Sequence, residues 1–199
     1  MHADTLALSA PPPHSVLAIP GSLRRGSCNR MLLEAAAAHA PPGIVLRLYD
    51  GLAAVSLFSE DVEAKGTPAG VRRLREHVAQ ADAVFIATPE YNQSIPGVRK
   101  NAIDWLSRGP EEVLNGKPVA IAGATKGRWG TRLAQSHLRH VLYATEALVM
   151  AQPSLFLAEA GRLFDSAGQL TDEATARSLR EFLLAFSHWI TRVGEKVAA

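Results

Sequence analysis

Hydrophobic residues along the chain gather in five short runs, and the stretches between them mix apolar and polar positions. Several of these runs are apolar at every position instead of alternating, which is typical of strands that are covered on both faces, as in a parallel sheet between helices. The five predicted strands are Val16–Ile19, Ile44–Tyr49, Ala83–Ala87, Val119–Ala122 and Leu148–Met150.

The stretches between the runs carry apolar residues three or four positions apart, which is the spacing of one helix face. Pro68 opens one such stretch, and Pro41 closes another because proline cannot continue a helix. Since parallel neighbours need a crossover connection, the alternation predicts an α/β fold with a doubly wound, five-stranded parallel sheet and helices on both faces. The predicted helices are Asn29–Ala40, Pro68–Gln80, Gly97–Arg108, Gly130–Ala144 and Asp172 to about Val193.

A length of 199 residues with 47% hydrophobic and 20% charged residues fits one globular domain with a sizeable core. We expect residues 1–14 to form a disordered tail, because they lack the basic start and the long apolar run of a signal peptide. Residues 15–199 are then expected to form the single domain. No run approaches the roughly 18 consecutive apolar residues of a membrane span, so we expect no membrane partner.

The formal net charge of +2 is far below the dense positive charge of nucleic-acid-binding proteins, which excludes that class of partner. Cys28 is the only cysteine, so the chain has no intramolecular disulfide, and we expect a reducing, cytoplasmic location. His137 and His140 lie three positions apart on a predicted helix, but no carboxylate accompanies them at helical spacing. We therefore expect surface or interface histidines and no metal site.

Ligands of open parallel sheets bind at the carboxyl ends of the strands, so the loops 20–28, 88–96 and 123–129 are the candidates. In the first loop Ser22, Arg24 and Ser27 surround the start of a helix, whose free N–H groups and dipole favour an anion such as a phosphate. The competing interpretation is a capped, solvent-exposed loop. Neither the glycine pattern of dinucleotide-binding folds nor a P-loop is present, which favours a mononucleotide such as FMN.

The second of these loops carries Tyr91 and Asn92 at the end of a strand, where an aromatic ring and an amide can meet a flat heterocycle. Glu90 can accept hydrogen bonds from the ring or the ribose, or it can cap neighbouring backbone. By composition alone, a rigid structural turn is an equally good interpretation.

Two motifs go further than composition. The first is Gly21-Ser22-Leu23-Arg24 with Ser27 and Asn29, and the second is Pro89-Glu90-Tyr91-Asn92-x-Ser94-Ile95-Pro96-Gly97-Val98-x-Lys100-Asn101-Ala102-Ile103-Asp104-Trp105. Together they resemble the NADPH-dependent FMN reductase family, the flavodoxin-like group of bacterial quinone, chromate and azo-dye reductases. The resemblance covers about Val16 to Met150. It implies a flavodoxin-like fold, non-covalently bound FMN, NADPH or NADH as co-substrate, and a homodimer or homotetramer.

The resemblance also implies which residues hold the cofactor. The FMN phosphate falls to Ser22, Arg24, Ser27 and Asn29, the ring and ribityl chain to Pro89, Glu90, Tyr91 and Asn92, and the flavin edge to Thr125, Lys126 and Gly127. The loop 123–130 departs from the small, glycine-rich pattern of the family at three of its positions: Lys126, Arg128 and Trp129. Lys126 and Arg128 either attract the phosphates of NADPH or are simply solvated, and Trp129 either narrows the acceptor pocket or packs in an interface or the core.

In such an enzyme a hydride passes from NAD(P)H to flavin N5 and on to an acceptor such as a quinone, a free flavin, an azo compound or a metal oxyanion. The cofactor carries the chemistry, so we expect no catalytic side chain. Cys28 has no second cysteine to resolve an oxidised form, which argues against a redox role. Two other function classes remain: a flavodoxin-type FMN electron carrier without its own turnover, and a doubly wound domain that binds no flavin.

Overall fold

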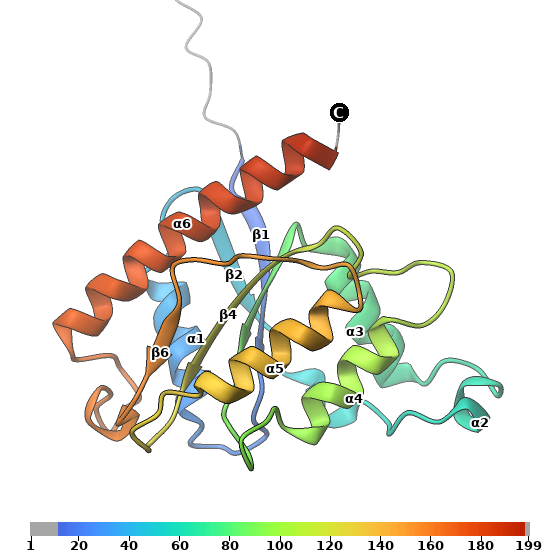
Figure 1. Ribbon diagram of the computed structural model, residues 1–199, viewed down its shortest axis with the longest axis horizontal. Helices are drawn as coiled ribbons and strands as arrows, with labels where there is room; N and C mark the ends of the chain where they lie inside the picture. Colours follow the sequence, from blue (N-terminus) through green and yellow to red (C-terminus); the bar gives the residue numbers. More distant parts are fainter. Residues whose placement is uncertain (1–11, 198–199) are drawn as a thin grey trace, which may run out of the picture.

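A parallel sheet runs through the centre of the structure, a computed structural model that describes residues 12–197 (Figure 1). Its path is β2-β1-β3-β4-β5, and every pair of neighbours is parallel. This is the strand order of the flavodoxin-like fold, so the predicted fold class is confirmed. The strands are β1 (His14–Pro20), β2 (Ile44–Leu48), β3 (Ala83–Ala87), β4 (Pro118–Ala124) and β5 (Leu148–Val149).

Only the last residues of the predicted tail, residues 1–14, belong to the part of the chain that the structure describes. Residues 1–11 lie outside the described residues. His14, by contrast, already belongs to β1 and pairs with Ile44 of β2, so the ordered sheet begins one residue earlier than the predicted domain boundary.

The edge of the sheet next to β4 differs from the prediction, because two short strands share it. β5 pairs with the start of β4, and β6 (Leu155–Leu157) pairs with its end, from Ala122 to Ala124. The sequence analysis missed β6, since three residues are too few for an apolar pattern to be recognised. The loop that leaves β4 therefore has a neighbouring strand that the sequence pattern did not reveal.

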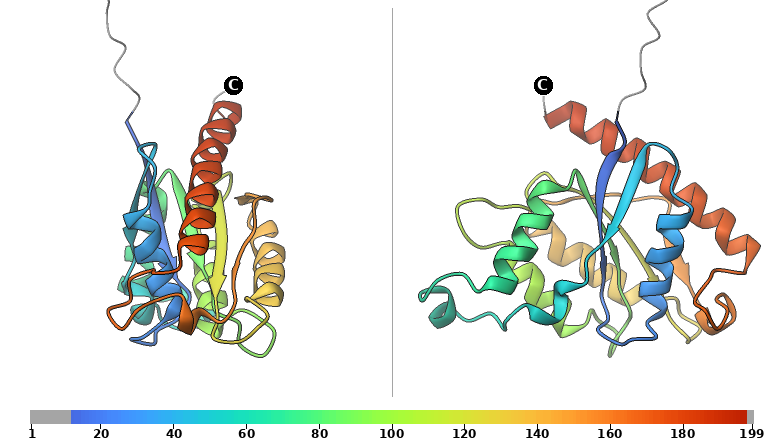
Figure 2. Two further views of the ribbon diagram at one scale, coloured as in Figure 1. Left: turned by 90° about the vertical axis from the view of Figure 1, so that its left-hand side faces the viewer. Right: turned by 180° about the vertical axis from the view of Figure 1, so that it is seen from behind.

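Helices cover both faces of the sheet (Figures 1 and 2). Alternate residues of each strand point to opposite faces, so β1 sends Val16 to the face covered by α1 and α6 and Leu17 to the face covered by α3, α4 and α5. In the left view of Figure 2, α6 runs across the first of these faces. The main helices are α1 (Cys28–Ala38), α3 (Ala69–Gln80), α4 (Gly97–Leu106), α5 (Arg132–Tyr143) and α6 (Glu173–Val197).

The five long helices lie where they were predicted, with shifted ends. The largest shift at a helix start is in α5, which begins at Arg132 instead of Gly130 because Gly130 and Thr131 have φ angles of 66° and 63°, in the left-handed region. Three short elements were not predicted: η1 (Gly51–Ala54), α2 (Glu60–Glu63) and η2 (Ala160–Arg162). Each has only one turn, which is too short for a helical pattern.

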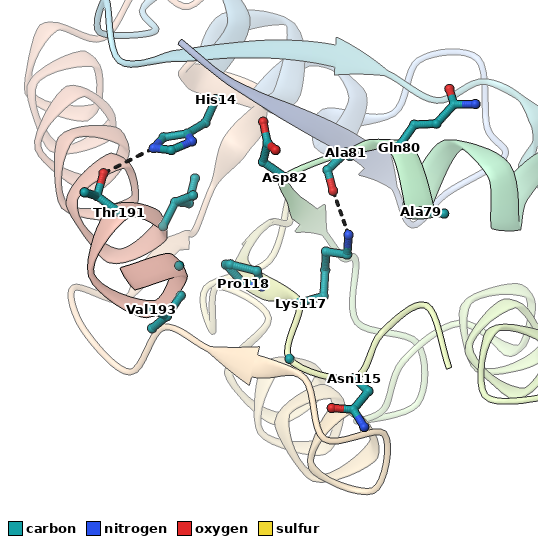
Figure 3. Close-up of a pocket in the computed structure, with 13 residues that line it drawn as sticks. His14, Ala79, Gln80, Ala81, Asp82, Asn115, Lys117, Pro118, Thr191 and Val193 are labelled. Carbon is teal, nitrogen blue, oxygen red and sulfur yellow. Dashed lines mark hydrogen bonds between the residues drawn. The ribbon is translucent and has the colours of Figure 1, made fainter. Parts of the chain in front are cut away.

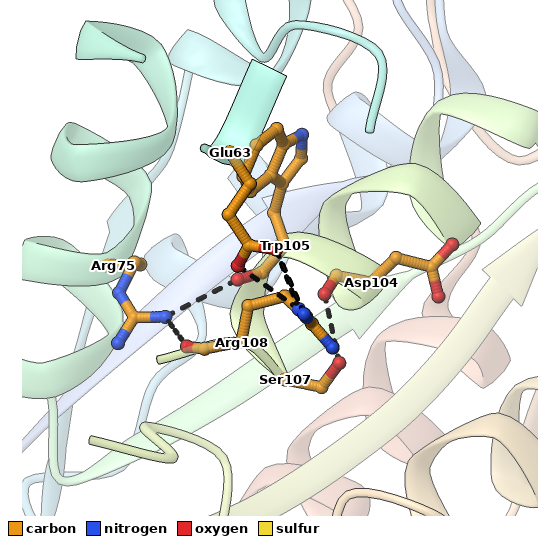
Figure 4. Close-up of polar contacts among 6 residues, drawn as sticks. All are labelled: Glu63, Arg75, Asp104, Trp105, Ser107 and Arg108. Carbon is orange, nitrogen blue, oxygen red and sulfur yellow. Dashed lines mark hydrogen bonds and ion pairs between the residues drawn. The ribbon is translucent and has the colours of Figure 1, made fainter. Parts of the chain in front are cut away.

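The segment that contains α2 is attached to the end of α4 and to the residues that follow it (Figure 4). The Arg108 Nη2 atom lies 2.9 Å from the Glu63 Oε2 atom, and this hydrogen bond holds the pKa of the Glu63 carboxyl below its usual value. The indole N–H of Trp105 donates to the Ser56 carbonyl at 2.8 Å. On the other side, Arg75 of α3 donates to the carbonyls of Trp105 and Arg108. These contacts hold α4 in place, and the loop that precedes α4 is one of the three candidate loops.

Candidate functional site

The loops that leave β1, β3 and β4 meet at the carboxyl end of the sheet, at the lower edge of Figure 1. The Gly21 N–H donates to the Ala87 carbonyl at 2.7 Å, and the Ser22 hydroxyl lies 3.4 Å from the Tyr91 hydroxyl. The Thr88 N–H donates to the Ala122 carbonyl at 3.0 Å. The structure therefore brings together the three loops that the sequence analysis selected.

Two glycines allow these loops to approach closely. A Cβ atom on Gly21 would lie 2.9 Å from the Cδ atom of Pro89, which is closer than such atoms approach. A Cβ atom on Gly123 would lie 2.0 Å from the Thr131 Oγ1 atom and 2.5 Å from the Thr88 carbonyl oxygen. Only a residue without a side chain fits at either position, so both contacts depend on glycine.

The first loop presents hydrogen-bond donors. Arg24 is exposed, and its Nη1 atom would lie 3.1 Å from a Cβ atom on Gly26, so the guanidinium folds back over the loop. The N–H groups of Leu23 and Gly26 have no acceptor within residues 12–197. Ser27 caps α1 by accepting a hydrogen bond from the Arg30 N–H at 3.4 Å. Free amides, a hydroxyl, a guanidinium and a helix N-terminus form a set of donors that fits a phosphate.

The four residues predicted for the phosphate differ in accessibility. Ser22 and Arg24 reach the surface of the loop, whereas Ser27 and Asn29 are buried. Asn29 exchanges two hydrogen bonds of 2.9 Å with the backbone of Ala124, its amide nitrogen donating to the carbonyl and its oxygen accepting from the N–H. Asn29 thus ties α1 to the end of β4, and its predicted contact with the phosphate stays a prediction.

A hollow of about 340 Å³ lies between the first loop and the residues that follow β2. Its lining includes Ser22, Arg24, Arg25 and Arg30. The one carboxylate in its lining belongs to Asp50, which pairs with Arg73 at 3.3 Å. The hollow therefore combines a positive field with space for an anionic group.

The second loop forms a tight hairpin. Tyr91 and Ser94 exchange backbone hydrogen bonds of 2.9 and 3.0 Å, and between them Asn92 and Gln93 have positive φ angles of 49° and 62°. Asparagine tolerates this conformation better than most residues. Pro89 is buried at the base of the loop, while the Tyr91 side chain is 51% exposed and faces the first loop through Ser22. The hairpin presents an aromatic ring beside the set of donors.

Glu90 caps a helix that lies far from it in the sequence. Its Oε2 atom accepts hydrogen bonds from the N–H groups of Leu133 at 2.9 Å and Ala134 at 3.0 Å, in the first turn of α5. Thr131 precedes this helix, but its hydroxyl accepts a hydrogen bond from the Gln135 amide and caps no backbone N–H. Of the roles considered for Glu90, the geometry shows backbone capping. The capped helix lies 43 positions further along the sequence, whereas the prediction was a cap of neighbouring backbone.

The third loop is held by the segment that follows β6. The Ala160 N–H donates to the Thr125 carbonyl and the Glu159 N–H to the Gly127 carbonyl, both at 2.9 Å. The Gly127 N–H donates to the Thr125 hydroxyl at 3.2 Å. Sequence reasoning missed these partners because it missed β6. They fix the loop backbone and leave its larger side chains free to project outward.

Those projecting side chains are Lys126, Arg128 and Trp129, the three residues that depart from the family pattern. Trp129 is 78% exposed, so neither core packing nor burial within this chain explains it. Lys126 and Arg128 are exposed and form no ion pair with any residue that the structure describes. Because the loops carry Arg24, Arg25, Lys126 and Arg128 and only one carboxylate, that of Glu90, they present a net positive charge, which attracts anionic ligands.

The opposite end of the sheet holds a larger hollow of about 730 Å³ (Figure 3). Several of its polar groups bond to the fold: His14 contacts the Thr191 hydroxyl at 3.2 Å, and Lys117 donates to the Ala81 carbonyl at 2.7 Å. Asp82 accepts from the Ser15 N–H at 2.7 Å. Burial lowers the pKa of Lys117. Since these groups stabilise the chain itself, the carboxyl end remains the better candidate for the functional site.

His137 has a partner within the fold, and the described residues show neither a metal-binding cluster nor a membrane-spanning helix. The Nδ1 atom of His137 lies 3.0 Å from the Ser94 hydroxyl, which joins α5 to the hairpin. No three potential metal ligands from histidine, cysteine, aspartate or glutamate gather among the described residues. None of the helices within residues 12–197 is long and apolar enough to cross a membrane.

The chain is similar to known flavoenzymes over most of its length. Residues 14–162 match the family model described as NADPH-dependent FMN reductase. An NAD(P)H-dependent FMN reductase of Pseudomonas aeruginosa is 44% identical over 178 residues, which cover 89% of this chain and 96% of that protein. A quinone reductase of Escherichia coli K12 is 40% identical over 180 residues, covering 89% and 96% respectively. Among solved structures, the flavoenzyme NAD(P)H:(acceptor) oxidoreductase FerB from Paracoccus denitrificans matches with a TM-score of 0.83 at 33% identity, over 90% of this chain and 98% of that one.

Proposed function

Because this chain belongs to the NADPH-dependent FMN reductase family, we propose that it is an NAD(P)H-dependent oxidoreductase with non-covalently bound FMN. Its acceptor is a small molecule such as a quinone, a free flavin, an azo compound or a metal oxyanion. The observation that carries this proposal is that two loops meet. One presents a set of phosphate donors at the start of α1, and the other is a hairpin with an aromatic ring. The Ser22 hydroxyl of the first lies 3.4 Å from the Tyr91 hydroxyl of the second. A mononucleotide has a phosphate at one end and a flat ring at the other, as this arrangement requires.

The residues present fit FMN by their chemistry. Ser22, Arg24 and the free amides of the first loop would hold the phosphate, with Ser27 and Asn29 fixing the start of α1. The hairpin residues Pro89, Tyr91 and Asn92 would line the ring and ribityl chain. Glu90 would position that hairpin through α5, and Thr125, Lys126 and Gly127 would border the flavin edge. The bound flavin would accept two electrons from NAD(P)H and deliver them to the acceptor.

The chain's own residues then have three tasks. The first loop anchors the phosphate, and the capped start of α5 keeps the hairpin in position. Lys126 and Arg128 draw the phosphates of NADPH toward the site. Trp129 narrows the space above it and favours flat acceptors. No side chain in this scheme acts as an acid, a base or a nucleophile.

Three broader features belong to the same proposal. We infer a single domain that begins with β1 at His14, a homodimer or homotetramer, and a cytoplasmic location. Light scattering on the purified protein measures the oligomeric state directly, and a monomer at micromolar concentration would contradict the expected assembly.

The proposal is tested with the purified protein and the variant Arg24→Ala. We expect a yellow protein that oxidises NADPH rapidly in the presence of a benzoquinone. Arg24→Ala should weaken FMN binding about 10- to 100-fold, because a hydrogen bond to a charged group contributes about 1.5–3 kcal/mol. Arg177→Ala, which removes an exposed cation on α6, is the control and should bind FMN like the wild type.

Three results would overturn the proposal. Colourless protein that does not take up added FMN would exclude a flavin site. Slow reduction by NADPH with accumulation of a half-reduced flavin would indicate an electron carrier. Equal FMN affinity in Arg24→Ala and the wild type would remove the first loop from the site.

A further inference from the structure

Arg99 places a guanidinium inside the apolar layer between α4 and the sheet. The residue is only 2% exposed, and it lines a small internal space together with apolar neighbours that include Ile19, Ile86 and Leu142. Its Nη2 atom donates to the Ile19 carbonyl at 2.9 Å, but its Nε atom has no partner. No carboxylate of the described residues forms an ion pair with it. A buried charge with one carbonyl as its partner costs stability and requires an explanation.

Burial without a counter-charge lowers the pKa of Arg99 to about 9. The side chain is therefore still protonated at neutral pH. Because the surroundings are apolar, its field is weakly screened and extends further than that of a surface arginine.

The position of Arg99 connects it to the two loops of the candidate site. It lies in the first turn of α4, which starts directly after the hairpin 88–96. Its partner Ile19 lies two residues before Gly21, at the base of the loop that carries the phosphate donors. The cation thus lies beneath both loops at once.

Neither carboxylate near the two loops pairs with Arg99: Asp50 forms an ion pair with Arg73, and Glu90 hydrogen-bonds to backbone N–H groups. A bound FMN brings a phosphate, and its ring gains electrons on reduction. A buried cation beneath the loops favours both of these negative charges.

We propose that Arg99 is an electrostatic positioning residue: its buried charge lowers the stability of the protein without FMN, and it favours reduced over oxidised FMN at the loops above. This inference rests on the proposed function. A purely structural arginine would hold the Ile19 carbonyl, and its loss would destabilise the fold and leave the flavin's preference unchanged.

The test compares neutral and charged replacements. Arg99→Leu and Arg99→Met remove the charge and keep much of the volume, whereas Arg99→Lys keeps a cation. Lys117→Met is the control, because it removes a half-buried cation that contacts the Ala81 carbonyl at the amino end of the sheet. For each protein, the midpoint potential of bound FMN is measured by spectroscopic titration, and the stability of the FMN-free form by chemical denaturation.

We expect both neutral variants to lose about tenfold of the preference for reduced over oxidised FMN, which is a fall of about 30 mV for a two-electron couple. Their FMN-free forms should unfold at a higher denaturant concentration than the wild type. Arg99→Lys should retain most of the potential, and Lys117→Met should leave it unchanged.

An unchanged potential in both neutral variants overturns the inference while the proposed function stands. Failure of both neutral variants to fold also overturns it, since relief from an unpaired buried charge is part of the claim. If the wild type itself binds no FMN, the proposed function fails instead, which is a distinct result.

Discussion

At the amino end of the sheet the charged side chains that line the hollow bond to the fold itself, whereas at the carboxyl end several cations project from loops and form no ion pair with a described residue. Lys117 and Asp82 each bond to the backbone of a neighbouring segment. Lys126 and Arg128 form no ion pair within the described chain, and Arg24 lies exposed on its loop. The hollow at the amino end has a volume of about 730 Å³, whereas the carboxyl end borders one of about 340 Å³ at the first loop and one of about 670 Å³ at Ser94 and Ile95 of the hairpin. Unsatisfied donors therefore identify the candidate site better than volume does.

The space around glycine residues also differs between the two ends of the sheet. Alanine substitutions at these glycines should have the largest effects on the free energy of unfolding. Gly123→Ala should destabilise the protein by about 1–3 kcal/mol, because the added Cβ overlaps Thr131 and Thr88 and the core cannot expand freely. Gly194 borders the hollow of the amino end, and a Cβ atom added there by Gly194→Ala would have no neighbouring atom within 4 Å among the described residues. This variant should gain about 0.5–1 kcal/mol, as alanine is the better helix former. Denaturant unfolding measures both, and equal stability of the two variants would contradict the inferred close packing.

The remote cap by Glu90 is expected to have an intermediate effect. Glu90→Ala should cost about 0.5–2 kcal/mol of stability, as the loss of a helix cap does, and should also weaken FMN binding because the hairpin loses its anchor on α5. Glu90→Gln keeps an acceptor oxygen and should fall between the alanine variant and the wild type.

Asp82→Ala is the matched change at the amino end. It removes the acceptor of the Ser15 N–H and should lower stability without changing FMN affinity. If both alanine variants left the FMN affinity unchanged, Glu90 would be a cap with no influence on the site.

The exposed side chains of the third loop should have the smallest effects. Replacing Lys126 and Arg128 together by alanine should raise the KM for NADPH by about two- to tenfold at low salt and by less at high salt, since exposed charges are screened. Replacing Lys65 and Arg177, exposed cations elsewhere, should not. Trp129→Ala should alter kcat/KM for a quinone and leave the KM for NADPH unchanged. A KM for NADPH that changes equally at low and high salt would contradict an electrostatic role of Lys126 and Arg128. Unaltered quinone kinetics in Trp129→Ala would contradict a role of Trp129 in acceptor binding.

Much of the architecture was predictable because a parallel strand covered on both faces must be apolar along its length. The run Ala83–Ala87 reads as a strand in the sequence, and the structure places β3 at the same residues. The short strand β6 was not predictable in this way, since three residues carry no period and its partner Ala124 lies about thirty positions away. The start of α5 was misplaced for a related reason, namely two left-handed residues whose conformation depends on the packing around Gly123 and Phe156.

The amino-acid sequence by itself determined the alternation of strands and helices, the strand ends at which a ligand meets the sheet, and the serine, arginine and tyrosine side chains available there. Only the tertiary structure decided the partners of those side chains. Asn29 bonds to a residue 95 positions away, Glu90 caps a helix 43 positions away, and Arg99 reaches a carbonyl 80 positions away. Local patterns follow from the geometry of a few neighbouring residues, whereas a buried polar group takes whichever partner the packed chain brings within hydrogen-bonding distance.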